Sequence, residues 1–341
     1  MITEKVSLAF PSYFPHFRCK CGDCRSVCCH GWRITLSEEE YYRLARLECS
    51  PSLRTALDHA FERFPDAEEE RFAFIAPDGA GNCRLLDADG WCSLQRACGE
   101  RVQPAVCRLY PRSVKPGDTV EASCSGSCER TVELLMTGEP LTFAVTELDV
   151  RTPVPPYKAE DAETAALRRR CLALWQDDGS WHERLAAIAD ALGIPAPAPV
   201  TPDAARALLT RISSVSVSLR ETGAAAQRKF SASAAVRTAQ VRLGTVLPLW
   251  ERYFSNVMAN HMFFVQFPAV GGALAHADAY AGFAAACAVV RLCILSEAAD
   301  APDTDTAAIR FADAAAAALR YIEHTDFYRN IPPVWRHLTR E

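Results

Sequence analysis

Cysteine is the residue type in this chain whose number and spacing could do chemistry. Twelve of the 15 cysteines lie within the first 128 of 341 residues, and five of those fall between Cys19 and Cys29. Thiolates this close in sequence can converge on one centre, as they do in zinc and iron–sulfur sites. Without a cation they would repel one another and oxidise. The pattern therefore favours a metal centre over buried free thiols that merely cluster.

The identity of the metal stays open between iron–sulfur and zinc. Twelve thiols exceed the need of one tetrahedral zinc ion, and the histidines of this region show no paired spacing. The adjacent side chains of Cys28 and Cys29 diverge, which suits a multi-iron cluster or two separate centres better than one ion. Further candidate ligands follow in turn-rich surroundings, namely Cys83, Cys92, Cys107 and Cys128. An iron–sulfur centre is favoured, with structural zinc as the alternative.

The cellular setting agrees with metal ligation rather than disulfide formation. A secreted disulfide scaffold would be short and would use its cysteines throughout. The chain opens with MITEKVSLAF, which has neither a basic region nor a long apolar segment. We therefore expect a cytoplasmic protein.

The net charge and the hydropathy of the chain exclude two classes of binding partner. A formal net charge of −5 provides no basic field for a nucleic-acid backbone. The longest apolar runs, around 262–275 and 279–290, are interrupted by His276, Asp278 and Arg291, and are shorter than the roughly 18 residues of a membrane span. We expect neither nucleic-acid binding nor membrane insertion.

The elements that must position the cysteines are short. Ser37 and Glu40 form a capping box that opens a helix. Other elements are indicated by apolar spacing and turn residues: a helix at 52–64, strands at 71–76, 119–123 and 141–148, a hairpin at 85–92, helical turns at 104–110 and a helix at 128–137. Three prolines between Arg151 and Pro156 predict a linker.

Beyond the linker the periodicity becomes helical. Apolar residues three and four apart predict helices at 159–176, 182–192, 202–221, 247–264, 272–295 and 305–324. The fold class is therefore α+β, mainly α. We expect a small cysteine-rich metal-binding domain of short strands and helices over 1–150, followed by an α-helical domain over 157–341.

The order of the motifs resembles a known family. It runs through Phe17-Arg-Cys19, Cys24, Cys28-Cys-His-Gly-Trp-Arg-Ile34, Cys83-Arg-Leu-Leu-Asp87, Gly90-Trp-Cys92, Gly99-Glu100, Cys107-Arg-Leu-Tyr-Pro-Arg112 and Ser127-Cys-Glu129. In the helical half, Asn256-Val-Met-Ala-Asn260-His-Met-Phe263, Phe267-Pro268 and Arg320-Tyr-Ile-Glu-His324 continue it. Together these resemble the flagellin lysine-N-methylase family and, more distantly, small zinc- or iron-chelating proteins. Val257 and His261 stand where that family has Tyr, and Cys21, Cys98 and Cys124 are extra to its pattern.

The resemblance implies an iron–sulfur protein that uses S-adenosylmethionine to methylate the ε-amine of surface lysines on flagellin. One or two 4Fe-4S clusters, with zinc as the alternative metal, would take ligands from Cys19, Cys24, Cys28, Cys29, Cys83, Cys92, Cys107 and Cys128. Methyl transfer from a sulfonium needs a neutral amine aligned in line with the donor.

Candidate residues outside the cysteines each have a functional and a structural interpretation. His324 and Glu323 could act as base or could be an ordinary charged pair at a helix end. Asn256 and Asn260 share one helix face and could hold a cofactor or a neighbouring backbone. His261, Tyr110 and Arg112 are further cofactor-binding candidates whose alternative is plain packing.

Two functions follow. The first is a lysine methyltransferase whose cofactor and substrate meet between the two domains. The alternative is a non-catalytic zinc- or iron-chelating protein or electron carrier.

Overall fold

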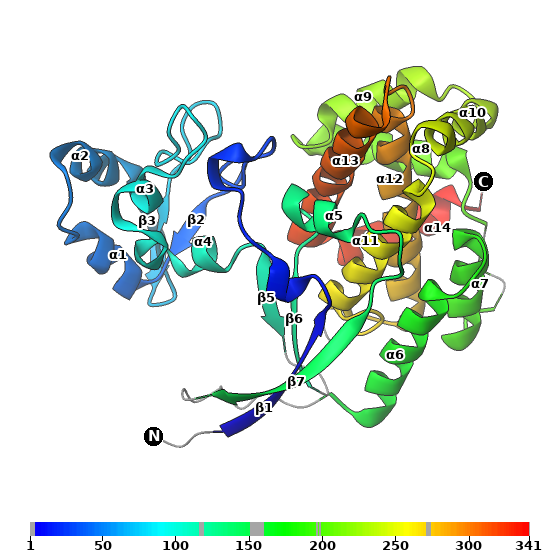
Figure 1. Cartoon of the computed structure of the whole chain (residues 1–341), viewed down its shortest axis with the longest axis horizontal. Coiled ribbons are helices and arrows are strands. Elements are labelled where there is room, and N and C mark those ends of the chain that lie inside the picture. The colour runs from blue at the N-terminus through cyan, green and yellow to red at the C-terminus, as the bar shows by residue number, and fades with distance from the viewer. Residues whose placement is uncertain are drawn as a thin grey trace. The chain divides into compact units, whose positions relative to one another are not determined.

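The computed structural model describes residues 4–115, 119–150, 160–195, 197, 199–270 and 274–340. The fold is α+β and mainly α, which confirms the expected class. The chain forms two compact units: unit 1 contains Met1–Phe17 and Pro111–Glu341, and unit 2 contains Arg18–Tyr110 (Figure 1). The proline-rich linker expected at 151–156 lies outside the described residues.

The sequence predicts a single domain boundary near residue 150, but the structure divides the chain elsewhere. The segments before and after the cysteine-rich region both pack with the helices. Tyr13, Phe17, Val132 and Leu141 belong to the same apolar core as the C-terminal helices. Burial of these side chains ties the first 17 residues and the segment after 110 to unit 1. Such contacts join residues far apart in sequence, so a composition change along the chain does not reveal them.

Unit 2 is a three-stranded antiparallel sheet of order β2-β4-β3 with short helices. Its elements are η2 (Cys21–Asp23), β2 (Ile34–Leu36), α1 (Glu38–Ala45), α2 (Pro51–Ala60), β3 (Phe61–Glu68), β4 (Arg71–Ile75), α3 (Ser93–Cys98), η3 (Glu100–Val102) and α4 (Ala105–Leu109). The Ser37–Glu40 capping box is present at the start of α1. Leu36, Leu44, Leu57 and Leu94 form the centre of a separate small core.

The sheet of unit 1 has the order β5-β6-β1-β7. Its strands are β1 (Glu4–Pro11), β5 (Arg112–Lys115), β6 (Val120–Cys124) and β7 (Phe143–Val150), and η1 (Phe14–His16) follows β1. Strand β1 pairs with β7 antiparallel along its whole length and with β6 in parallel, with Leu8 opposite Val120 (Figure 1). The N-terminal strand is thus an inner strand of the sheet, a pairing that sequence pattern alone did not predict.

Helices make up the rest of unit 1. They are α5 (Glu129–Leu135), α6 (Ala162–Gln176), α7 (Trp181–Ala191), α8 (Pro202–Val215), α9 (Arg220–Lys229), α10 (Ser233–Val246), α11 (Trp250–Val265), α12 (His276–Ala298), α13 (Thr304–His324) and α14 (Phe327–Leu338). Among the described residues, α12 alone is long and apolar enough to cross a membrane, and its apolar window is fully buried. It packs against α8, α9, α13 and α14, which makes it the central core helix.

Some expected elements end differently. The helix expected at 52–64 stops at Ala60, because Phe61 begins β3 and pairs with Ile75. The expected hairpin at 85–92 is a single bridge between Leu86 and Cys92. The helix expected at 202–221 is broken at Ser216, whose extended backbone separates α8 from α9. At Phe61, strand pairing overrode local helix propensity.

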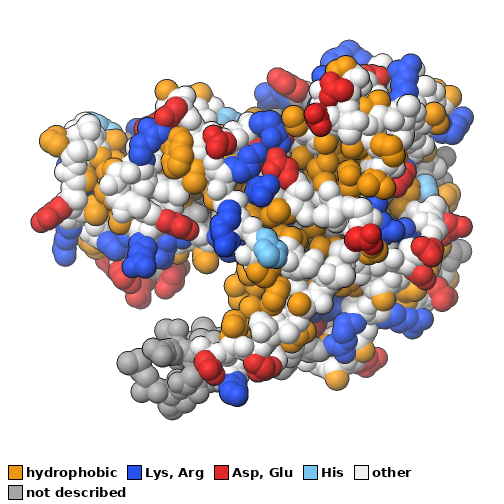
Figure 2. All heavy atoms as spheres, viewed as in Figure 1, with side chains coloured by type: hydrophobic (Ala, Val, Ile, Leu, Met, Phe, Trp, Pro, Cys, Tyr) orange, Lys and Arg blue, Asp and Glu red, His pale blue; other side chains and the backbone are white. Residues whose placement is uncertain are grey.

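Charged side chains of both signs are interspersed over each unit on the face that Figure 2 shows. This distribution agrees with the small net charge of −5.

Candidate functional site

Five of the eight predicted metal-ligand cysteines lie together in unit 2. The thiol of Cys29 hydrogen bonds with those of Cys28 and Cys83. The charges of Cys28, Cys83 and Cys92 also act on Cys107. We name Cys28, Cys29, Cys83, Cys92 and Cys107 the thiol cluster.

Local structure positions the thiol cluster through backbone contacts. The amide of Cys83 donates to the Cys29 carbonyl at 2.6 Å, which brings the two loops together. Glu40 caps α1 with one carboxylate oxygen and accepts the Ala105 amide with the other at 2.6 Å. Since Ala105 begins α4, this second bond fixes the helix that carries Cys107.

Thiol acidity in the cluster reflects crowding. Hydrogen bonds with Cys28 and Cys83, reinforced by burial, raise the pKa of Cys29. The hydrogen bond between Cys29 and Cys83 lowers the pKa of Cys83, because Cys29 donates to the Cys83 thiolate. Burial, followed by the neighbouring thiolate charges, raises the pKa of Cys107. These thiols cannot all ionise together unless a cation compensates their charge.

The remaining predicted ligands lie elsewhere. Cys19 lies beside Cys21, whose amide donates to the Cys19 sulfur at 3.3 Å. Cys24 follows η2, and Cys128 belongs to unit 1, where it precedes α5. Among the described residues, no three His, Cys, Asp or Glu side chains are arranged as ligands of one metal ion. The metal and its ligand set stay a prediction.

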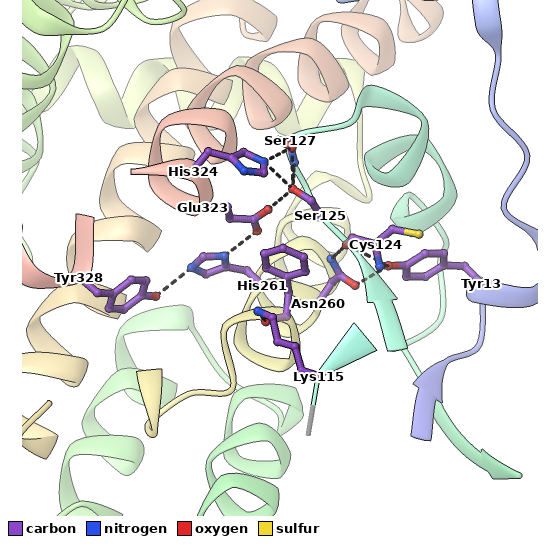
Figure 3. Close-up of polar contacts among 11 residues, drawn as sticks. Tyr13, Lys115, Cys124, Ser125, Ser127, Asn260, His261, Glu323, His324 and Tyr328 are labelled. Carbon is purple, nitrogen blue, oxygen red and sulfur yellow. Dashed lines mark hydrogen bonds and ion pairs between the residues drawn. The ribbon is translucent and has the colours of Figure 1, made fainter. Parts of the chain in front are cut away.

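A chain of polar side chains crosses the interior of unit 1 (Figure 3). Tyr328 contacts His261 Nε2 at 2.9 Å, and His261 Nδ1 contacts Glu323 Oε1 at 2.8 Å. Both His261 and Glu323 side chains are fully buried. Because a carboxylate only accepts, Nδ1 carries a proton, and in the neutral ring of that tautomer Nε2 accepts from the Tyr328 hydroxyl. His261 therefore sits in the core with both ring nitrogens bonded.

The chain continues from Glu323 to two serines. Ser125 donates to Glu323 Oε2 at 2.5 Å, and Ser127 lies 2.8 Å from His324 Nε2. Gly126 between them permits this approach, since a Cβ there would lie 2.4 Å from the Leu319 side chain. Burial lowers the pKa of His324 below its usual 6.5. This direction favours the neutral ring, in which Nε2 can accept a hydrogen bond from the Ser127 hydroxyl.

Asn260 holds the strand end that leads into these serines. Its amide nitrogen donates to the Cys124 carbonyl at 3.0 Å, and its oxygen accepts from the Tyr13 hydroxyl at 2.7 Å. Tyr13 in turn accepts the Cys124 amide at 3.0 Å. Asn260 is thus placed to fix the loop that carries Ser125.

The side chain of Asn256 is hydrogen bonded to backbone groups. Its oxygen accepts the Leu141 amide at 2.9 Å, and its nitrogen donates to the carbonyls of Leu135 and Glu139 at 3.1 and 2.9 Å. Of the two interpretations for this residue, these bonds favour the structural one.

Replacing Asn256 by Ala is expected to lower the free energy of unfolding by about 2–4 kcal/mol, since it leaves several buried backbone groups unpaired. Denaturant titration monitored by circular dichroism measures this loss. Asn330, which is exposed on α14, provides the control, and its Ala variant should stay within about 0.5 kcal/mol of the parent. Equal stability of the Asn256 variant would contradict the assignment.

Tyr110 and Arg112 fall into different units. The Tyr110 ring lies 6.0 Å from that of Trp32 in unit 2, and the Arg112 guanidinium lies 4.9 Å from the Phe17 ring in unit 1. These described contacts are packing contacts.

A pocket of about 300 Å³ opens beside the polar chain. Glu323, Tyr328, Asp326 and Lys115 line it together with Phe264, Val265, Val270, Leu274 and Ile322. Lys115 donates to the Phe264 carbonyl, and its ammonium lies 4.2 Å from the Phe264 ring. Burial lowers the pKa of Lys115, although the charges of Glu323 and Glu121 oppose this effect. We name this feature the Glu323 pocket.

Sequence reasoning missed several members of this site. Tyr13, Lys115, Ser125, Ser127 and Tyr328 were not singled out. The one available signal was the Ser-Gly-Ser sequence between Cys124 and Cys128, whose glycine marks a close backbone approach.

Comparison with known proteins found distant relatives. A lysine-N-methylase of Salmonella choleraesuis is 27% identical over 111 residues, which are 32% of this chain and 27% of that protein. A lysine-N-methylase of Salmonella typhimurium is 26% identical over the same length. The flagellar biosynthetic protein FliU of Salmonella muenchen is 24% identical over 110 residues, or 64% of its length. The aligned part thus spans about a quarter of the two methylases. No family model and no solved structure matches.

Proposed function

We propose that this protein is a protein-lysine N-methyltransferase that uses S-adenosylmethionine and acts on flagellin or a related flagellar protein. The Glu323 pocket carries the proposal: Glu323 lines it, and its buried carboxylate, bonded to His261 and Ser125, would turn into the pocket to receive a proton. The names of these relatives, lysine-N-methylase and flagellar biosynthetic protein, support the reaction and the substrate class.

The Glu323 pocket suits a lysine side chain. Its apolar wall, formed by Val265, Leu274 and Ile322, matches the four methylenes of lysine, and Glu323 and Asp326 supply carboxylates for the amine. Lys115 and Arg329 also line the pocket, and these two cations offset the two carboxylates and so disfavour a further ammonium.

In the proposed reaction the ε-nitrogen loses its proton to Glu323. S-adenosylmethionine, when bound, would supply the methyl group to the nitrogen lone pair and leave as a neutral thioether, so the lysine product would be a methylammonium ion. Ser125, Ser127 and His324 offer Glu323 a hydrogen-bonded route for returning the proton to solvent.

We further propose that the thiol cluster supplies ligands of a metal centre, with iron–sulfur favoured over zinc. Five neighbouring thiols that oppose one another's ionisation are suited to a compensating cation, and they would move together to bind it, because no three of the described side chains are arranged as ligands of one ion. A cluster or zinc ion here would organise loops that contain little regular structure.

The test incubates anaerobically purified protein with S-adenosylmethionine and unmethylated flagellin, and detects methyl-lysine by mass spectrometry. Formation of methyl-lysine is expected. A colourless protein with stoichiometric zinc and no transfer would instead favour the non-catalytic metal-binding alternative.

A further inference from the structure

The wall of the Glu323 pocket contains a lysine of this chain, Lys115. It comes from the end of β5, beside the polar chain (Figure 3). Its ammonium donates to the Phe264 carbonyl and lies 4.2 Å from the centre of the Phe264 ring. These contacts hold an amine in the same cavity in which the substrate amine is proposed to react.

The ammonium of Lys115 forms no ion pair with a carboxylate of the described residues. The charges of Glu323 and Glu121 act on it only from a distance, because both carboxylates are bonded to other groups. Glu121 binds Arg168 at 2.7 Å. Glu323 binds His261 at 2.8 Å.

This environment favours the neutral amine of Lys115. Burial lowers its pKa, and the charge of Arg168 acts in the same direction, while Glu323 and Glu121 oppose both. A largely desolvated lysine without a paired carboxylate reaches its neutral, nucleophilic form more readily than an exposed lysine does.

A methylated Lys115 would fit the position that the amine now holds. Methylation keeps the positive charge, so the attraction to the Phe264 ring persists. A singly or doubly methylated ammonium also keeps an N–H for the Phe264 carbonyl. Val265 and Ile322 of the same pocket offer apolar surface for the added methyl groups.

We propose that the protein methylates its own Lys115, which makes this lysine a modification site inside the Glu323 pocket. Lys115 Nζ first loses a proton to the Glu323 carboxylate, which passes it to solvent. The nitrogen lone pair then forms a bond to the methyl carbon of S-adenosylmethionine, while the carbon–sulfur bond breaks and its electron pair stays on sulfur. The products are a methylammonium at Lys115 and a neutral thioether. This inference rests on the proposed function, because it uses the same donor and the same proton acceptor.

The experiment incubates the full chain without flagellin, with S-adenosylmethionine that carries a deuterated methyl group. Peptide mass spectrometry before and after incubation measures methylation at each lysine. We expect the deuterated methyl group on Lys115, or an unlabelled one already present before incubation. Lys5, which is exposed, and Lys229, which pairs with Asp300 at 3.1 Å, are internal controls. Equal methylation of Lys5, Lys229 and Lys115 would indicate non-specific transfer and overturn the proposal.

A variant of the proton acceptor tests whether Lys115 reacts in the Glu323 pocket. Glu323→Gln should methylate Lys115 at least about tenfold more slowly, both in the cell and after purification. Glu221→Gln is the matched control, because Glu221 is exposed on α9 and does not line the pocket, and it should match the parent. The rate constant of the parent should not depend on protein concentration, since each chain modifies itself. Parental methylation of Lys115 in Glu323→Gln would overturn the proposal.

A parallel reaction with unmethylated flagellin separates this inference from the proposed function. Transfer to flagellin with Lys115 unmodified overturns the inference and leaves the function standing. Methylation of Lys115 without transfer to flagellin supports the inference and removes flagellin as the substrate. Methylation of neither overturns both.

Discussion

Replacing Glu323 by Gln is expected to slow methyl transfer by a factor on the order of 10²–10⁴, because the proposed proton acceptor is lost. Gln has the same shape and can still accept from His261 and bind Ser125, so the fold should persist. Single-turnover transfer to flagellin, followed by mass spectrometry, gives the rate.

The pH dependence separates a base from a merely structural residue. Free lysine amines lose their protons as pH rises toward about 10.4. The difference in methyl-transfer rate between the parent and Glu323→Gln should therefore shrink as pH rises. A structural defect would instead lower the rate at every pH. Glu221, exposed on α9, supplies the control, and its Gln variant should match the parent. A Glu323→Gln enzyme with the parental rate at neutral pH would refute the assignment.

Replacing Cys28 or Cys107 by Ser is expected to remove most of the bound metal, because each thiol belongs to the thiol cluster. Loss of metal should also lower the solubility and stability of unit 2, where the ligands span loops with few strands or helices. Iron and acid-labile sulfide determined together report a cluster, and zinc without sulfide reports the alternative.

Cys49 provides the matched control for this experiment. It precedes the capping residue of α2 and is outside the thiol cluster, so Cys49→Ser should keep the full metal content. Parental metal content in both the Cys28 and Cys107 variants would show that the thiol cluster does not supply the metal ligands.

Several parts of the fold could be predicted because their signals are local. The capping box at Ser37 and Glu40 starts α1 as expected, and the helix expected at 305–324 is α13, Thr304–His324. Periodicity also placed α11, although its start moved from 247 to Trp250. Each of these signals lies within one or two helical turns, where backbone and side-chain contacts are between near neighbours.

The candidate site was only partly predictable. The sequence indicated that Asn256 and Asn260 share a helix face, but it left open whether they hold a ligand or backbone. The structure shows Asn256 bound to the 135–141 loop and Asn260 bound to the Cys124 backbone. Helix geometry fixes which residues share a face, whereas the partner of that face depends on packing.

The sequence by itself determined the α+β class, the helical second half, the concentration of cysteine in the first 128 residues and the adjacency of Glu323 and His324. Only the tertiary structure decided that the first strand and the 111–150 segment pack with the helices. It also decided that Ser125 reaches Glu323 across 198 residues of chain. Local hydrogen bonding and periodicity are encoded in short windows, but contacts between distant segments depend on how whole elements bury their apolar faces against one another.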